Sequence, residues 1–246
     1  MIFIGIDLAW TYQNETGVCV IGERGKVEYL DAQVYSNDEI IDIVKSYDDK
    51  KLCIAIDAPL IVNNEGGSRT AERELMKSKI HGHRLFAFQS NRTFLTNTFG
   101  EIRGETLMGM ILDALPEVTS GEDPFRSGVV ETFPTGICCG LFPEIFPVKY
   151  KRKPKVPFEE TLKEMQRLRN RFKALEDKEN LISGFVSQIP ADIMNIDRKM
   201  HKHMEDKIDA FLCAFGMYSI YNEIAQMKKF GSDAEGVIVI PVKIYP

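Results

Sequence analysis

Short apolar runs alternate along the chain with polar and glycine-containing segments. Strands are predicted at 2–7, 16–22 and 26–33, with a tight turn at 22–25. Their short connections favour an antiparallel meander. The stretch KLCIAIDAPL at 51–60 is almost continuously apolar, which is typical of a strand buried on both faces of a sheet. The pattern therefore predicts an α/β protein.

Helices are predicted where apolar residues recur every three to four positions. One is expected over 37–47, with Asn37 as its N-cap. Further helices are predicted at 158–176 and 200–226, and further strands at 128–134 and 235–244. Because proline donates no backbone hydrogen bond, Pro241 is expected to end the last strand or confine it to an edge.

The region 61–126 has a weaker pattern and is interpreted as an insertion of helices and loops. The GGS at 66–68 is expected to cap a helix over 69–79, and 104–115 has helical spacing. The segment QSNRTFLTNTFG at 89–100 is predicted to be irregular. A loop rich in proline and lysine follows at 147–157.

The composition narrows the classes of protein. The chain has 246 residues, with 36 acidic and 31 basic side chains and a net charge of -5, so no overall positive field attracts nucleic acid. Its five cysteines have no CxxC spacing and mostly occupy apolar contexts, where free thiols pack. The apolar start is too short for a signal peptide, and no window of about 18 apolar residues exists. We expect a cytoplasmic protein that neither spans a membrane nor is anchored to one.

Five carboxylates interrupt or end apolar elements. Asp7 stands in GIDLAW, Asp57 in AIDAPL and Glu131 in VVETFP, whereas Asp206 and Asp209 lie together in EDKIDAFLCA. Each acid taken singly is explained by a helix cap, an ion pair or exposure at a strand end, since burying a lone carboxylate is costly. Taken together, acids from several strand ends and one helix supply the hard oxygen ligands of a divalent cation.

The geometry of the helix predicted at 200–226 indicates which of its acids are better placed to join such a cation site. At about 100° per residue, Asp209 lies roughly 100° from the centre of the apolar stripe and Asp206 roughly 160° from it. Glu205 lies closer to the stripe by the same measure. Because Asp206 and Asp209 are i, i+3 neighbours that share one face, we rank Asp209 first, Asp206 second and Glu205 third.

Several motifs occur together in a fixed order: GIDLAW, IDAPL, ETFPTG, a late DxxDA helix and a final EGVIVIP strand. In this order they resemble a widespread family of uncharacterised proteins, predicted to be nucleases with a ribonuclease H-like fold. The resemblance covers nearly the whole chain. It implies one α/β domain over 1–246 with a mixed five-stranded sheet, antiparallel in its first three strands, helices on both faces and a helical insertion at about 61–126.

The resemblance also implies the chemistry of the acids. In the wider superfamily, acids on the first and fourth strands and on the last helix hold two magnesium or manganese ions, and these positions match Asp7, Asp57 and Asp209 with Asp206. Glu131 matches the acid after the insertion, where this chain has phenylalanine in place of a histidine frequent in relatives. The implied activity is hydrolysis of phosphodiesters in DNA or RNA by ions about 3.5 to 4 Å apart, with these five acids as catalytic residues.

Other side chains are candidates for substrate binding: Trp10, Arg69, Arg73, Lys151 and Arg152. Trp10 is expected either to form a wall of the cleft or to pack in the core. Arg69, Arg73 and Arg84 of the insertion either grip a phosphate or form surface ion pairs with Glu72 or Glu74. The basic stretch 149–155, with Tyr150 between its lysines, either suits a nucleic-acid strand that stacks and follows a charged groove or is simply solvated.

Two other functions stay open at this stage. A nucleotide-binding phosphotransferase of the actin and sugar-kinase type shares the strand order and an early aspartate. It needs glycine-rich phosphate loops, however, and the segment LAWTYQNETG has only Gly17. A non-catalytic binding module on the same fold would use the acids structurally.

Overall fold

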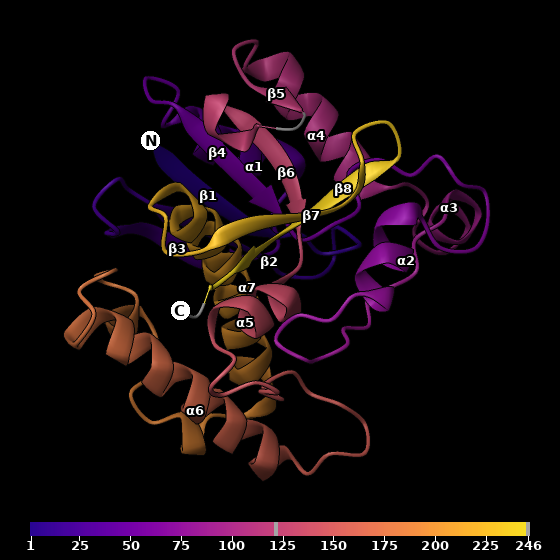
Figure 1. The fold of residues 1–246 in the computed structure, drawn as a ribbon. Coiled ribbons are helices and arrows are strands. Elements are labelled where there is room, and N and C mark those ends of the chain that lie inside the picture. The colour runs from indigo at the N-terminus through magenta and orange to yellow at the C-terminus, as the bar shows by residue number, and fades with distance from the viewer. Residues whose placement is uncertain (121–122, 245–246) are drawn as a thin grey trace.

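The chain folds around a mixed, mostly open β-sheet, which a computed structural model describes over residues 1–120 and 123–244 (Figure 1). The strands are β1 (Ile2–Asp7), β2 (Thr16–Ile21), β3 (Val27–Gln33), β4 (Leu52–Ile56), β5 (Thr119–Ser120), β6 (Gly128–Thr132), β7 (Gln226–Ser232) and β8 (Gly236–Val242). Their order is β3-β2-β1-β4-β6-β8-β7, with the short β5 beside β6. The described residues thus form an eight-stranded sheet, and the prediction of five strands was wrong in number.

Parallel and antiparallel pairs occupy different parts of this sheet. β1, β4, β6 and β8 run parallel, as does β5 with β6. The pairs β1–β2, β2–β3 and β7–β8 are antiparallel, which confirms the predicted meander at the start of the chain. The β7–β8 hairpin extends the sheet beyond the expected strands.

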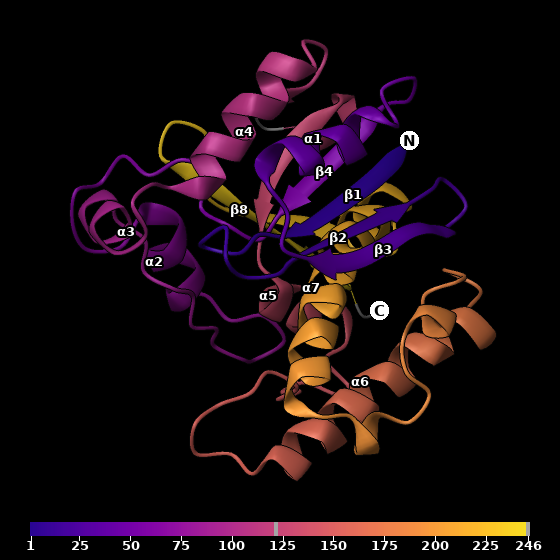
Figure 2. The ribbon, with the colours of Figure 1, turned by 180° about the vertical axis from the view of Figure 1, so that it is seen from behind.

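Helices cover both faces of the sheet. They are α1 (Asn37–Lys45), α2 (Thr70–Lys77), α3 (Arg92–Phe99), α4 (Arg103–Ala114), α5 (Pro134–Leu141), α6 (Phe158–Asp177) and α7 (Arg198–Tyr221), with short 3-10 turns η1 (Pro124–Arg126), η2 (Val186–Gln188) and η3 (Ile193–Asn195). Both views place α6 and α7 below the sheet and α4 above it, whereas α2 and α3 lie at one side (Figures 1 and 2). This arrangement gives a mixed α/β fold.

The alternation of side chains along β1 assigns its two faces. Ile2, Ile4 and Ile6 belong to the core under α1 and α4, whereas Phe3 belongs to the core under α6 and α7. Gly5 lies on the α7 side, where an added Cβ would come within 2.0 Å of the Ala210 carbonyl oxygen. The same alternation turns the next odd-numbered residue, Asp7, toward α7.

Helix starts differ from the sequence predictions where side-chain capping decides them. α1 is capped by Ser36, which forms a capping box with Glu39, so the N-cap lies one residue before the predicted Asn37. The GGS does not cap α2, whose N-cap is Arg69. The segment predicted to be irregular contains α3, because the Asn91 side chain accepts a hydrogen bond from the Phe94 amide and starts the helix.

The end of the chain also differs from its prediction. The helix expected to reach residue 226 ends at Tyr221, and β7 begins at Gln226 after a short connection. Pro134 occupies the first turn of the unpredicted α5, where a missing N–H removes no helical bond. Pro241 lies inside β8 and does not end the strand. It follows the residues that pair with β6, and at this position β8 pairs with β7 alone, as expected for proline at an edge.

The structure bears on two expectations from composition: that the cysteines are free and packed in the core, and that no segment spans a membrane. All five cysteines are free and buried, as their apolar contexts predicted. Over the described residues, no helix combines the length and apolarity required to cross a membrane.

Candidate metal centre

Three carboxylates converge at one edge of the sheet. Asp7 ends β1, Asp57 directly follows β4, and Asp209 lies in the middle of α7. One oxygen from each lies within 4.8 Å of the others. Because β1 and β4 are parallel neighbours with Ile6 opposite Ile56, their carboxyl ends bring the two strand aspartates side by side. We call Asp7, Asp57 and Asp209 the Asp7 cluster.

The alternation of the strands explains which acids join the cluster. Asp57 follows Cys53 and Ala55, which face the core under α7, so its side chain also points to the α7 side. Glu131 pairs in register with Ile56, whose side chain belongs to the core under α1 and α4. Glu131 is therefore directed away from the α7 side and lies outside the Asp7 cluster.

Glu131 is instead held by Arg69 at the start of α2. The guanidinium reaches both Glu131 oxygens, at 2.8 and 2.5 Å, and its Nε contacts Glu72 Oε1 at 2.8 Å. The Leu60 amide also donates to Glu131 Oε2 at 3.1 Å. Burial raises the pKa of Glu131 while Arg69 opposes that rise. This buried triad is a structural ion-pair network, and it ties the insertion to β6.

Asp209 has two partners from the lysine-rich loop. The Lys151 ammonium lies 2.5 Å from Asp209 Oδ2, and the Tyr150 hydroxyl donates to Asp209 Oδ1. His201 Nε2 lies 2.9 Å from the Tyr150 carbonyl oxygen, which fixes the loop to α7. Lys151 therefore supplies positive charge beside the Asp7 cluster.

Asp206 lies one turn before Asp209 and is almost fully buried. Its Oδ1 contacts the Lys202 ammonium at 2.5 Å, whereas Oδ2 has no hydrogen-bond partner within the part of the chain that the structure describes. The backbone of Gly17 packs against this turn, where a Cβ would come within 2.1 Å of the Asp206 carbonyl oxygen. α7 is thus pressed closely against β1 and β2.

Burial and mutual repulsion raise the pKa values of three of these acids. Burial, followed by the charges of Asp209 and Asp57, raises the pKa of Asp7 well above its ordinary value. Burial raises the pKa of Asp57 to about 7, although Lys151 opposes the rise. Burial raises the pKa of Asp206 to about 6 against the opposing charge of Lys202. The protein environment thus disfavours the ionised forms of these acids, and a bound cation would favour them instead.

The donor set fits a hard divalent cation. Mg²⁺ and Mn²⁺ prefer carboxylate oxygens, and the Asp7 cluster presents three of them. A side-chain hydrogen bond joins Asp7 to Asp206, so a fourth carboxyl group lies beside the cluster. Asp206 Oδ2 is buried and meets no other side-chain or backbone donor in the described chain. The cluster could therefore bind a metal ion, which would offset the repulsion among its carboxylates.

A cleft opens directly on the cluster. We call it the acid cleft; it is lined by Asp7, Asp57, Arg69, Trp10 and Phe88, among others. Trp10 stacks on Phe99, with ring centroids 5.1 Å apart and an interplanar angle of 17°. Its side chain is 36% exposed, so it forms a cleft wall and is not packed in the core.

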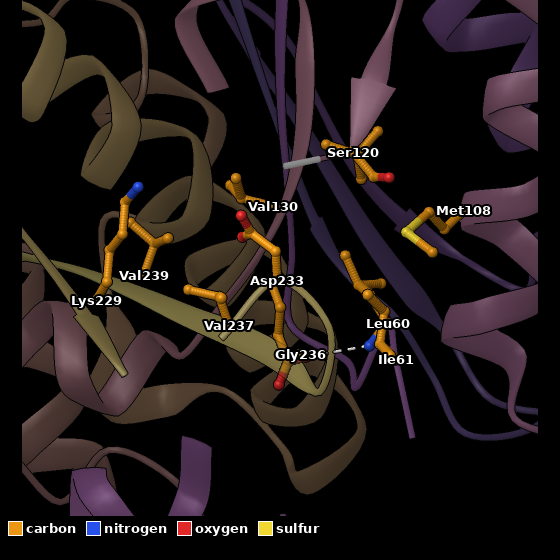
Figure 3. A pocket seen from close by; sticks show the side chains of 12 residues that line it. Leu60, Ile61, Met108, Ser120, Val130, Lys229, Asp233, Gly236, Val237 and Val239 are labelled. Carbon is orange, nitrogen blue, oxygen red and sulfur yellow. Dashed lines mark hydrogen bonds between the residues drawn. The ribbon is translucent and has the colours of Figure 1, made fainter. Parts of the chain in front are cut away.

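A second pocket lies between Leu60, Met108 of α4 and the β7–β8 hairpin (Figure 3). Four valines from β6 and β8 are among its lining residues, and its charged residues are Glu131, Lys229 and Asp233. It contains no member of the Asp7 cluster. The acid cleft is therefore the better candidate for a site of chemistry.

A family comparison places the chain among known sequences. A family model described as protein of unknown function (DUF429) matches residues 5–227. The chain belongs to the DUF429 family. No curated protein and no solved structure matches it. The family membership implied by the sequence motifs is confirmed, and the matched region contains the whole Asp7 cluster and the acid cleft aromatics.

The remaining predicted site residues of this DUF429 protein lie at different distances from the cluster. Lys151 contacts it directly. Arg73 bonds to Thr70 within its own helix and lines a separate pocket. The Arg152 amide lies 3.4 Å from Glu205 Oε2, and Glu205 pairs with Lys202. Tyr150 is buried, so the interpretation of it as a stacking surface was wrong.

Sequence reasoning missed other members of the site. Lys202 could have been predicted, because it lies four residues before Asp206, the spacing at which oppositely charged side chains pair on a helix. The Tyr150 hydroxyl could not be assigned to Asp209 because 59 residues separate them. Phe88 lay in a segment without periodicity, so no pattern indicated its place in the acid cleft.

Proposed function

We propose that this protein is a metal-dependent nuclease that hydrolyses phosphodiester bonds of nucleic acid. The observation that carries the proposal is the convergence of Asp7, Asp57 and the buried Asp209 within 4.8 Å, with Asp7 and Asp57 lining an open cleft. Three converging carboxylates with so few donors are poorly explained as structural caps, since each would be better satisfied alone. They suit the binding of one or two Mg²⁺ or Mn²⁺ ions.

The topology supports a ribonuclease H-like interpretation of the fold. The order β3-β2-β1-β4-β6, with β2 antiparallel to both neighbours, agrees with the mixed five-stranded sheet expected for that fold. The first acid ends the central β1, the second follows β4, and the third lies on a late helix. On this interpretation, β5, β7 and β8 are additions to the common sheet.

Each side chain of the site has a distinct role in the proposed reaction. Asp7, Asp57 and Asp209 would hold the cation, with Asp206 behind them. When bound, divalent ions supply an activated water and offset charge on the leaving oxygen. Lys151 lies where its ammonium can contact a phosphate oxygen, and Tyr150 positions Asp209 through its hydroxyl. Glu131 and Arg69 position the cleft wall through their buried ion pair.

Cleavage of labelled oligonucleotides tests the proposal. We expect cleavage with Mg²⁺ or Mn²⁺ and none with a chelator. Asp7→Asn should reduce the rate by about 100-fold or more, because it removes a ligand while keeping the shape of the side chain. The control is Asp42→Asn, which changes an exposed acid on α1 and should leave the rate unchanged.

Fold integrity is checked by the melting temperature. Asp7→Asn should melt at the same temperature as the wild type or higher, because it removes one of several repelling buried carboxylates. Cleavage that survives both the chelator and Asp7→Asn would exclude the metal-dependent mechanism. Stabilisation by ATP in place of cleavage would instead indicate a phosphotransferase.

A further inference from the structure

An aromatic surface borders the acid cleft. Trp10, Phe88, Phe94 and Phe99 contact one another with ring centroids 5.1 to 6.3 Å apart. Phe88 and Phe94 are 49% and 43% exposed. Clustered aromatic rings that stay half exposed provide flat faces to a ligand and little to the core. We call these four residues the aromatic surface.

A basic groove lies on the other side of the cluster. We define it by Arg84, Lys149, Lys151 and Lys153 with Phe86, which line one pocket. Phe86 is 82% exposed. In the described part of the chain, no ion pair joins Arg84, Lys149 or Lys153 to a carboxylate. The groove therefore offers several uncompensated cations to a negatively charged ligand.

The two surfaces meet at the Asp7 cluster. Lys151 belongs to the basic groove, and its ammonium contacts Asp209 of the cluster. The segment 85–88 forms a wall shared by both, because Leu85 and Phe86 line the groove whereas Ala87 and Phe88 line the acid cleft. The basic groove, the Asp7 cluster and the aromatic surface are therefore contiguous.

We propose that the substrate of this site is single-stranded nucleic acid, with its phosphates in the basic groove and an unpaired base stacked on the aromatic surface. The proposal rests on the proposed function, because it places the scissile phosphodiester at the Asp7 cluster. Proteins that bind single strands combine a charged groove with aromatic faces on which bases stack. A duplex keeps its bases stacked on one another and cannot present them to Phe88 or Trp10.

The single tryptophan gives a direct measurement. Trp10 is the only tryptophan of the chain, so all tryptophan emission reports on the aromatic surface. A 20-nucleotide oligothymidylate and an oligouridylate are titrated into the protein in chelator, so that no cleavage occurs. We expect both single strands to quench the emission, and a duplex of equal length to bind at least tenfold more weakly.

Matched variants separate stacking from charge. Phe88→Leu keeps an apolar side chain but removes the ring, and should weaken binding about 5- to 150-fold, the range for one stacked base. Tyr221→Leu is its control, because Tyr221 is also an exposed aromatic but lies 12 residues, about 18 Å, along α7 from Asp209. Its binding should equal that of the wild type.

The charge of the groove is tested in the same way. Lys149→Gln with Lys153→Gln should weaken binding and flatten its dependence on salt, since fewer counterions are released. Lys45→Gln, an exposed lysine at the end of α1, should leave binding unchanged. Because these side chains are not buried, the variants should keep the wild-type melting temperature, which is measured alongside.

The outcomes distinguish this inference from the proposed function. Quenching by single strands without any metal-dependent cleavage supports the binding surface and contradicts the nuclease. Metal-dependent cleavage with equal affinity for duplex and single strand, or with no effect of Phe88→Leu, overturns the single-strand inference and leaves the nuclease standing. Absence of any binding also overturns the inference.

Discussion

At the scale of single residues, Asp7 and Asp57 show how burial decides protonation. Asp7 ends β1 and Asp57 directly follows β4, and the other residues of both strands are buried. The charged forms are therefore disfavoured, and the pKa of Asp57 rises to about 7. Burial and the neighbouring carboxylates disfavour ionisation of these acids. A divalent cation bound to them would remove that penalty, because it binds the ionised carboxylates.

The raised pKa of Asp57 predicts a pH dependence of stability. In the unfolded chain this carboxyl ionises near pH 4, whereas in the folded chain it keeps its proton to about pH 7. The folded state thus binds more protons between these values, and stability falls as pH rises from about 4 to 7. The metal-free wild type should lose melting temperature relative to Asp57→Asn between pH 5 and 8.

Metal binding should show the opposite trend, because the ion binds the ionised carboxylate. Mn²⁺ should raise the melting temperature of the wild type more at pH 8 than at pH 5.5. Parallel melting curves for the wild type and Asp57→Asn across this range, or a shift by Mn²⁺ that is independent of pH, would contradict the account of Asp57.

Lys151 is predicted to compete with the cation. Its ammonium lies 2.5 Å from Asp209 Oδ2, where it repels any ion in the cluster. Lys151→Gln should therefore tighten Mn²⁺ binding about tenfold or more, measured by calorimetry. Lys153→Gln removes a nearby charge that contacts no acid of the cluster and should change affinity little. Unchanged or weaker binding by Lys151→Gln would show that Lys151 does not oppose the ion.

At the scale of elements, the close approach of α7 to β1 positions Asp209. The helix can lie this near because Gly5 and Gly17 present no side chain where the backbones of Ala210 and Asp206 pass. A conventional side chain at either glycine would push the helix outward. The distance from Asp7 to Asp209 is thus set by two residues that carry no chemistry.

Gly5→Ala tests this contact. The new Cβ would lie 2.0 Å from the Ala210 carbonyl oxygen, so α7 must shift. We expect a loss of about 3 kcal/mol or more in the free energy of unfolding, and weaker Mn²⁺ binding. Gly109→Ala is the control: apart from its chain neighbours and the backbone of its own helix, no described atom lies within 4 Å of the added Cβ, and alanine should stabilise α4 by about 0.5 to 1 kcal/mol. Urea unfolding measures both, and equal stabilities would refute the packing argument.

At the scale of the whole molecule, the insertion is joined to the sheet by a buried ion-pair network. Arg69 starts α2, and its guanidinium spans Glu72 of the same helix and Glu131 of β6. α2 also packs on β7, so the network joins the insertion to the parallel strands and to the terminal hairpin. Because Arg69 and Glu131 line the acid cleft, the network also shapes the cleft wall.

Arg69→Met should destabilise the protein by about 3 to 5 kcal/mol, since it leaves buried carboxylates without a partner. Adding Glu131→Gln should restore part of the loss, which a double-mutant cycle by urea unfolding measures. Arg126→Met removes the exposed pair with Asp123 and should change stability by less than about 1 kcal/mol. A small effect of Arg69→Met would mean that water satisfies the acids.

The sequence by itself determined the alternation of strand and helix, the starting meander and the acids that could meet. Apolar residues repeat every two positions in a strand and about every 3.6 positions in a helix, so neighbouring residues alone reveal both. Ile2, Ile4 and Ile6 show the strand repeat. Local side-chain capping, as at Ser36 and Asn91, left weaker signals and led to errors at helix starts.

Only the tertiary structure decided which acids share a site. The sequence placed Glu131 with Asp7 and Asp57, but the register of β6 on β4 turns it to the opposite face. The partners of Asp209 come from a loop 59 residues away, and the aromatic surface joins rings from three segments. Such contacts depend on strand register and helix approach, which are properties of the packed chain and leave no periodic trace in its sequence.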